Sequence, residues 1–194
     1  MNLNLRHSRQ PTRTILMVLA LMVFAQSASN GNTANPTTEY RVKAAFLLSF
    51  PKFIEWPSEA FESSTAPWRI GVLNSPEMVQ VLNTGSDKKI RGRSIEIIVM
   101  DELTADQDYH VLFIGNADGE NAHNAEDLSV ILSDYLQSPV LVVSEDKESF
   151  AAGGVINFYL ERGKTRFEIH TRAAQQHQLV IGANLLRVAR LVED

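Results

Sequence analysis

The sequence predicts an α/β protein, a three-layer α/β/α sandwich around a mixed, mostly parallel sheet of about six strands that ends in an antiparallel hairpin. Short apolar runs alternate along the chain with segments of helical periodicity, which is the order of parallel strands joined by crossover helices. These runs are apolar from end to end, as strands covered on both faces are. Near the C-terminus, two alternating segments flank Arg162-Gly163-Lys164, a pattern typical of a hairpin turn.

Residues 1–28 are predicted to be a secretory signal peptide. Three arginines and no acidic residue come first, an unbroken apolar run follows at 15–24, and small residues come next. We expect cleavage between Ala25 and Ser29. The apolar run is much shorter than the ~20 residues of a bilayer span, although an uncleaved signal anchor is the alternative. The small residues include no cysteine, which excludes a lipoprotein anchor.

The part after the leader is predicted to be one acidic domain. Residues 29–38 are polar and contain Gly and Pro, which predicts a flexible linker, and 39–194 are long enough for a full core. The leader holds three of the 18 Lys and Arg and none of the 23 Asp and Glu, so its removal changes the net charge from −5 to −8. This balance argues against nucleic acid and anionic membrane as partners. Because the chain has no cysteine, disulfides, thiolate zinc sites and thiol catalysis are impossible.

The most apolar segment after the leader is 39–57, and its spacing predicts a helix. Thr38 is expected to cap this helix, and Pro51 is expected to kink or break it. The charges of Lys43 and Lys52 rule out a membrane span. One helix face is expected in the core, and the remaining apolar side chains form a candidate dimer or partner interface. The candidate interface residues are Tyr40, Phe46, Phe50, Phe53, Trp56 and, from the C-terminal helix, Arg187.

The later elements follow in order. Strands are predicted at 68–74, 94–100, 109–115 and 139–144, and helices at 76–82 and 124–136. The hairpin strands are 155–160 and 165–170, and two final helices are predicted at 171–178 and 183–191. Gly153 and Gly154 are expected to be structural, because glycine permits a positive φ or a close approach between elements.

No catalytic or cofactor motif is present. The sequence lacks GxGxxG after the first strand, the P-loop pattern and the GxSxG nucleophile elbow. The histidines after the leader form neither HExxH nor HxH, so exposed side chains and no metal are expected. These histidines are His110, His123, His170 and His177. We therefore expect no enzyme activity and no cofactor.

Three polar segments remain as candidate ligand sites. The loop 116–127 lacks the ligand spacing of a calcium loop, and the adjacent carboxylates of Glu145 and Asp146 are expected to be solvated. Both segments follow predicted strands, where open α/β sheets bind ligands. The hairpin and the helix after it carry a candidate ligand or recognition patch, for which ordinary exposed charge is the alternative. The patch residues are Arg162, Arg166, His170 and Arg172.

Four stretches together resemble the YfiR-like family of bacterial periplasmic proteins. They are YRVKAAFLLSFPKFIEWP, VLFI in the third strand, SPVLVVSEDKESFAAGGVINFYLERGKTRFEIHTRAA and LVIGANLLRVARLV. The resemblance covers 39–192. Two departures stand out. The chain has no cysteine, so disulfide-based redox sensing does not carry over, and His170 stands where the family often has Asn.

The resemblance implies a non-catalytic periplasmic regulator that tends to form homodimers. Such a protein binds the periplasmic sensor domain of an inner-membrane partner, a diguanylate cyclase, and represses cyclic di-GMP signalling and biofilm output. The residues themselves leave two alternatives open. One is a periplasmic small-ligand-binding protein that serves a membrane receptor or transporter, with its ligand near Gly115–Gly119 and Ser144–Gly154, and the other is an envelope hydrolase.

Overall fold

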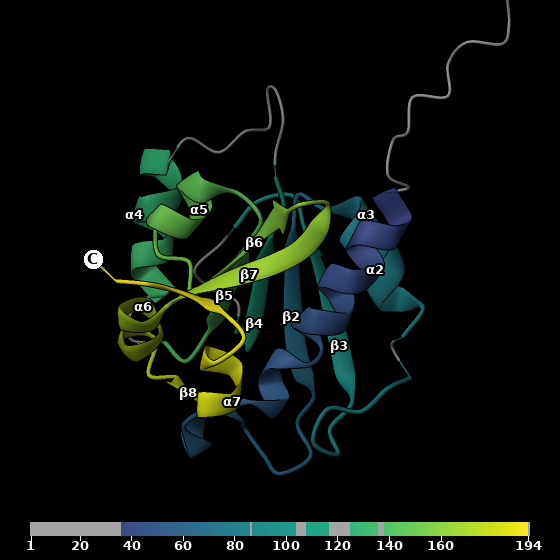
Figure 1. Ribbon diagram of the computed structural model, residues 1–194. Helices are drawn as coiled ribbons and strands as arrows, with labels where there is room; N and C mark the ends of the chain where they lie inside the picture. The colour runs from purple at the N-terminus through teal and green to yellow at the C-terminus, as the bar shows by residue number, and fades with distance from the viewer. Residues whose placement is uncertain (1–35, 86, 104–107, 117–124, 136–137, 194) are drawn as a thin grey trace, which may run out of the picture. The chain divides into compact units, whose positions relative to one another are not determined.

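The computed structural model describes residues 36–85, 87–103, 108–116, 125–135 and 138–193 (Figure 1). The expected signal peptide and linker residues 29–35 lie outside this part of the chain. The helices are α2 (Pro36–Leu47), α3 (Pro76–Asn83), α4 (Ala125–Tyr135), α5 (Lys147–Ala151), α6 (Thr171–Gln176) and α7 (Ala183–Leu186), with 3-10 turns η1 (Phe50–Lys52) and η2 (Ser58–Ala60). The strands are β1 (Ile54–Glu55), β2 (Trp68–Leu73), β3 (Ile95–Met100), β4 (Val111–Ile114), β5 (Leu141–Ser144), β6 (Ile156–Glu161), β7 (Lys164–His170), β8 (Val180–Ile181) and β9 (Arg190–Val192).

The main sheet has seven strands in the order β3-β2-β4-β5-β6-β7-β9. The five strands from β3 to β6 are parallel, β7 returns antiparallel to β6, and β9 runs parallel to β7. A second sheet pairs β1 and β8 antiparallel. The mixed, mostly parallel sheet with helices on both faces confirms the predicted fold class.

The order of the parallel strands reverses next to β2. The chain passes from β2 to β3 on one side and then crosses to β4 on the other side. Loops that leave adjacent strands in opposite directions create a crevice at their carboxyl ends, which is where open α/β sheets bind ligands. The segments after β2, β4 and β5 therefore form a candidate ligand-binding edge of the sheet.

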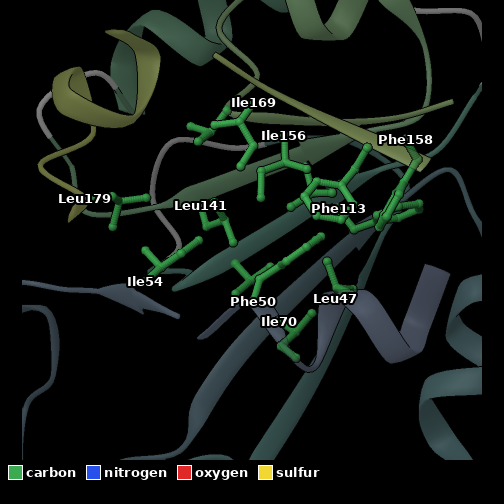
Figure 2. Close-up of a cluster of buried hydrophobic side chains, with 14 of the residues drawn as sticks. Leu47, Phe50, Ile54, Ile70, Phe113, Leu141, Ile156, Phe158, Ile169 and Leu179 are labelled. Atoms are coloured by element: carbon green, nitrogen blue, oxygen red, sulfur yellow. The ribbon is translucent and has the colours of Figure 1, made fainter. Parts of the chain in front are cut away.

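Two hydrophobic clusters fill the space on the two faces of the sheet. Helices α2 and α3 cover one face, where Leu47 and Phe50 pack on β4, β5 and β6 (Figures 1 and 2). Helix α4 covers the other face with Leu128 and Leu132. Every residue of β4 and β5 is buried, which explains why β4 is apolar throughout and β5 is apolar except for Ser144.

The first helix ends where the position of Pro51 predicts a break. Proline has no N–H to donate to the carbonyl of Leu47, four residues earlier, and Leu47 is the last residue of α2. The predicted cap is wrong, because α2 starts at Pro36 and Thr38 lies inside its first turn. Residues 36–38 of the expected linker are therefore helical.

The C-terminal segment differs most from prediction. Instead of one helix over 183–191, α7 has four residues and β9 follows it. Strand β9 pairs with β7, and Arg190 donates from Nε to Glu168 Oε2 at 2.8 Å. Pairing with the sheet and a salt bridge to a buried carboxylate outweigh the helical spacing, which is a weak preference.

Candidate functional site

A buried polar cluster joins α2 to the carboxyl ends of β4 and β5. Lys43 Nζ lies 2.5 Å from Glu145 Oε2 and 2.6 Å from Glu39 Oε1. Tyr40 Oη donates to Glu145 Oε1 at 2.9 Å, and the Asn116 N–H donates to the same oxygen at 3.0 Å. The Glu145 side chain is only 4% exposed, so the expectation of a solvated carboxylate is wrong. A buried carboxylate needs partners of this kind, because an unpaired one is costly.

Local structure places each member of the cluster. Tyr40 and Lys43 lie one turn apart on α2, and Glu145 is the first residue after β5. A Cβ at Gly115 would lie 2.4 Å from the Asn74 carbonyl oxygen, so only glycine lets the ends of β2 and β4 approach this closely. This approach fixes the backbone that presents the Asn116 N–H to Glu145.

The arrangement favours binding over acid–base chemistry. Burial, followed by the charge of Glu145 and its hydrogen bond, raises the pKa of Tyr40. Tyr40 therefore stays protonated and acts as a donor. Both oxygens of Glu145 already accept hydrogen bonds, from Tyr40, Asn116 and Lys43. Tyr40 and Glu145 are therefore engaged with each other and with their neighbours.

The neighbouring Asp146 has a structural role. Its Oδ1 accepts from the Ser149 N–H at 2.7 Å, and its Oδ2 accepts from Ser149 Oγ at 2.6 Å. This is an N-cap, and it starts α5, a helix that the sequence analysis missed. The two adjacent carboxylates therefore have different partners, and the half-buried Asp146 caps a helix.

A family model described as YfiR/HmsC-like matches residues 40–190. The chain belongs to the YfiR/HmsC-like family. Membership confirms the resemblance and places the chain in a non-catalytic family of periplasmic regulators of cyclic di-GMP signalling. A search of curated proteins finds no match to it.

Two of the four stretches that resemble the family meet in the buried cluster. Tyr40 and Lys43 come from the first stretch, and Glu145 comes from the third, 102 residues after Lys43. Asn116 follows two residues after the stretch VLFI. Sequence analysis took Tyr40 as a surface residue and Glu145 as solvated, because periodicity along one helix does not reveal a partner so distant in the chain.

The predicted interface residues divide into buried and exposed ones. Phe50 is 1% exposed and stacks near Phe158, so it belongs to the core and offers no area to a partner in this conformation. Phe46 is half-buried against the same aromatic cluster. Trp56 packs edge-on against Trp68 with ring centroids 4.9 Å apart. Phe53 and Arg187 are exposed, and they stay interface predictions together with the half-buried Tyr40, Phe46 and Trp56.

Phe53 is exposed immediately before the β1–β8 sheet. Ile54 pairs with Ile181 and Glu55 with Val180, and Ile54 points into the core. Alternation therefore places Glu55 and Val180 on the outward face. Phe53 ends η1 with a helical backbone, at the residue before β1. Phe53 and Val180 are 42% and 61% exposed. Gly182, whose N–H donates to the Phe53 carbonyl at 2.8 Å, has no side chain to cover Phe53. Val180 was missed because a two-residue strand has no detectable periodicity.

The predicted basic patch is spread along β7. Arg162 lies in the turn before this seven-residue strand, and Arg172 lies in the helix after it. At ~3.3 Å per residue the two ends of the strand are roughly 20 Å apart. Arg166 is near Glu161, at 3.8 Å, and His170 is half-buried against Phe150. The structure does not bring these four residues into one site.

The histidines differ from expectation. His110 and His177 are buried, at 5% and 0% exposure, and His170 is half-buried, while His123 lies outside the described residues. His110 extends the β2–β4 ladder. Its ring atom Nδ1 accepts from the backbone N–H of Arg69 at 3.0 Å, and the backbone N–H of His110 donates to the Arg69 carbonyl. Burial lowers the pKa of both His110 and His177.

The two glycines after α5 occupy positions where a residue with a side chain would be strained or would clash. Gly153 has φ of 139°, and a Cβ at Gly154 would lie 2.8 Å from Phe150 Cα.

Within the described residues, no group of three or more His, Cys, Asp and Glu side chains is placed to hold a metal ion. In the same part of the chain, every helix is too short or too polar to cross a bilayer.

Proposed function

We propose that this YfiR/HmsC-like chain is a periplasmic protein that binds the periplasmic sensor domain of an inner-membrane protein and represses it. The proposed partner is a diguanylate cyclase, so binding lowers cyclic di-GMP synthesis and biofilm output. The observation that carries the proposal is the family match over residues 40–190. The predicted leader supports export, and the fully partnered carboxylate of Glu145 supports a role without catalysis.

The exposed surface around the β1–β8 sheet, with Phe53 before β1 and Val180 in β8, is the proposed contact surface. Phe53 and Val180 expose apolar area there, and aromatic residues are favoured anchors in interfaces. Repression follows if the chain binds the inactive sensor conformation more tightly than the active one. A shift from 1:99 to 99:1 in favour of the inactive state needs about 5.5 kcal/mol of differential affinity. A stress signal relieves repression by reducing this difference.

The test uses capture and a cellular readout. Tagged chain, expressed with its leader, is purified from the periplasm and used to capture partners from detergent-solubilised membranes, and cyclic di-GMP is measured in cells with and without the gene. We expect a membrane protein with a diguanylate cyclase domain to be captured and the deletion to raise cyclic di-GMP. Capture of no such protein, together with unchanged cyclic di-GMP, contradicts the proposal.

A variant pair tests the surface. Phe53→Ser combined with Val180→Ser removes apolar area from the proposed contact, while Val130→Ser, 67% exposed on α4, is a matched control. We expect the double variant to weaken capture at least about tenfold and the control to retain it. Equal capture by all variants assigns the partner to another face. A homodimer, also proposed, is tested by sedimentation of the same samples.

A further inference from the structure

A cavity of about 370 Å³ lies against the buried cluster, at the carboxyl ends of the parallel strands. This volume is within the usual range for small-molecule sites, and the location is the one that open α/β sheets use for ligands. Its lining combines charged, hydrogen-bonding and apolar side chains from α2, β6 and the segments after β4 and β5. The lining residues are Glu39, Tyr40, Lys43, Asn116, Glu145, Phe158, Tyr159 and Leu160.

The charges on the wall do not balance. Two carboxylates, Glu39 and Glu145, face one ammonium group, that of Lys43. The Glu145 side chain is 4% exposed and accepts from three donors, one of them the Lys43 ammonium, so the negative charge that a ligand can reach is that of Glu39, which is 27% exposed. Glu39 lies in the first turn of α2, where the helix contributes about half a positive charge, which is not enough to cancel a full carboxylate. The cavity therefore favours a cation and disfavours an anion.

Glu39 has the capacity to bind a further donor. Lys43 contacts its Oε1, and within the described residues no other ion pair reaches this carboxylate. Its side chain is 27% exposed, in contrast to the 4% of Glu145. A ligand ammonium group can thus approach Glu39 without breaking the pair between Lys43 and Glu145.

The other wall is apolar and open. Leu160, near the end of β6, is 58% exposed, and Phe158 and Tyr159 precede it along the same strand. An apolar stem attached to the ammonium group would cover Leu160 and remove it from water. The two walls together select a molecule with a cationic head and a short apolar body.

We propose that this cavity binds a small organic cation, a protonated primary amine on a short apolar stem, with Glu39 as the residue that accepts its hydrogen bonds. The cluster of Tyr40, Lys43, Asn116 and Glu145 forms the rigid floor of the site. The inference goes beyond the proposed regulatory function, because it assigns a ligand class to a cavity that the proposed contact residues Phe53 and Val180 do not line.

The test is a titration of the isolated protein followed by NMR, which needs no partner protein. The probe is 3-methylbutylamine at neutral pH, and 3-methyl-1-butanol is the uncharged control of the same shape. We expect saturable shifts of the backbone amides of Glu39, Lys43, Asn116 and Leu160, with a dissociation constant in about the millimolar range for so small a ligand. The alcohol is expected to bind at least about tenfold more weakly.

Two substitutions locate the binding. Glu39→Gln keeps the size of the side chain and is expected to weaken amine binding at least about tenfold. Glu148→Gln, at an exposed position of α5, removes the same charge elsewhere and is expected to leave binding unchanged. Leu160→Ser, also exposed, is expected to weaken binding without unfolding the chain, so the proposal remains testable if Glu39→Gln is unstable.

Several results would overturn the ligand assignment. One is the absence of saturable shifts at amine concentrations up to roughly 10 mM, tenfold above a millimolar dissociation constant. Others are equal binding of the alcohol and full binding of the amine by Glu39→Gln. An equal loss of binding in Glu39→Gln and Glu148→Gln would indicate general charge attraction. Because the titration involves this chain alone, its failure does not bear on the proposed repression, and failed membrane capture does not bear on the cavity.

Discussion

Lys43 and Glu145 form a buried ion pair between helix α2 and the carboxyl end of β5, with 2.5 Å between Nζ and Oε2. The pair ties the first helix of the domain to the centre of the sheet. It also joins two of the sequence stretches that mark the YfiR/HmsC-like family. Lys43 and Glu145 therefore form a structural ion pair and also line one wall of the cavity at the carboxyl ends of the strands.

The first prediction concerns the cost of breaking this pair. Lys43→Met leaves the Glu145 carboxylate buried without its cation, so we expect the free energy of unfolding to fall by about 3–5 kcal/mol in urea denaturation. Lys147→Met, at an exposed position of α5, is the control and is expected to change it by less than about 0.5 kcal/mol. The double variant Lys43→Met, Glu145→Leu should recover much of the loss. Equal stability of Lys43→Met and the wild type would contradict the account.

The second prediction concerns the close approach of the β2 and β4 ends. Gly115→Ala places a methyl group 2.4 Å from the Asn74 carbonyl oxygen and 2.7 Å from Ser75 Cβ, so backbone must move. We expect a loss of at least 1–3 kcal/mol, about the usual cost of overpacking, and a changed NMR shift of the Asn116 amide. Gly85→Ala is the matched control, because its nearest contact would be an ordinary 3.7 Å. An unperturbed Asn116 amide in Gly115→Ala would refute the link to Glu145.

The fold could be predicted because its signals are local. Strand β4 is apolar at every position and β5 at every position but Ser144, and the hairpin of β6 and β7 has a turn sequence between alternating segments. Each of these patterns lies within a single strand or hairpin. A continuous apolar run reflects a strand that is buried on both faces of the sheet, and an alternating pattern reflects a strand that is buried on one face. The predicted strand order along the chain then limits the sheet to an α/β sandwich.

The polar cluster and the last strand could not be predicted because they depend on tertiary partners. Nothing near Glu145 in the sequence indicates that Tyr40 and Lys43 will desolvate it, so an adjacent acidic pair is interpreted as solvated. The segment before Val192 has helical spacing, yet it pairs with β7 because Glu168 is buried and needs Arg190. His110 is similar, since its ring accepts a hydrogen bond from the Arg69 N–H of β2, where a backbone carbonyl would be the usual acceptor, and the sequence does not reveal this.

The third prediction concerns pH. Burial lowers the pKa of His110 and His177 in the folded chain, while the unfolded value is ~6.5. The unfolded state therefore binds more protons below pH ~6.5. Stability is complete above that pH and falls as pH decreases from there toward the folded pKa, by at most ~1.4 kcal/mol per histidine per pH unit. Chemical denaturation between about pH 8 and pH 5 measures the slope.

A substitution identifies the contribution of His110 to this slope. His110→Gln removes the titrating ring and is expected to flatten the decrease in stability below pH ~6.5, although it lowers stability at neutral pH by the loss of the contact to the Arg69 N–H. His123→Gln, outside the described residues, is a second comparison. A slope that is unchanged in His110→Gln would assign the acid sensitivity to other groups.

The fourth prediction concerns a polar row that crosses four strands and holds β9. Ser144 Oγ donates to Asn157 Oδ1 at 3.2 Å, and Asn157 Nδ2 donates to Glu168 Oε1 at 2.9 Å. Arg190 completes the row through Nε at 2.8 Å from Glu168 Oε2, with a second contact from Nη2. Arg190 also lies over the ring of Tyr159, 4.1 Å from its centroid.

Removal of Arg190 is expected to release the edge strand. Arg190→Ala leaves the buried carboxylate of Glu168 with only Asn157, so we expect a loss of about 1–3 kcal/mol in unfolding free energy, the desolvation cost of one lost charged partner. Backbone amides of 190–192 should exchange with deuterium much faster, while those of β4 remain protected, because the change is confined to the sheet edge. Arg187→Ala, whose guanidinium contacts only the nearby Asn184 among the described residues, should leave both measurements unchanged. If Arg190→Ala exchanges like Arg187→Ala at 190–192, strand pairing alone holds β9, and the ion pair is not its anchor.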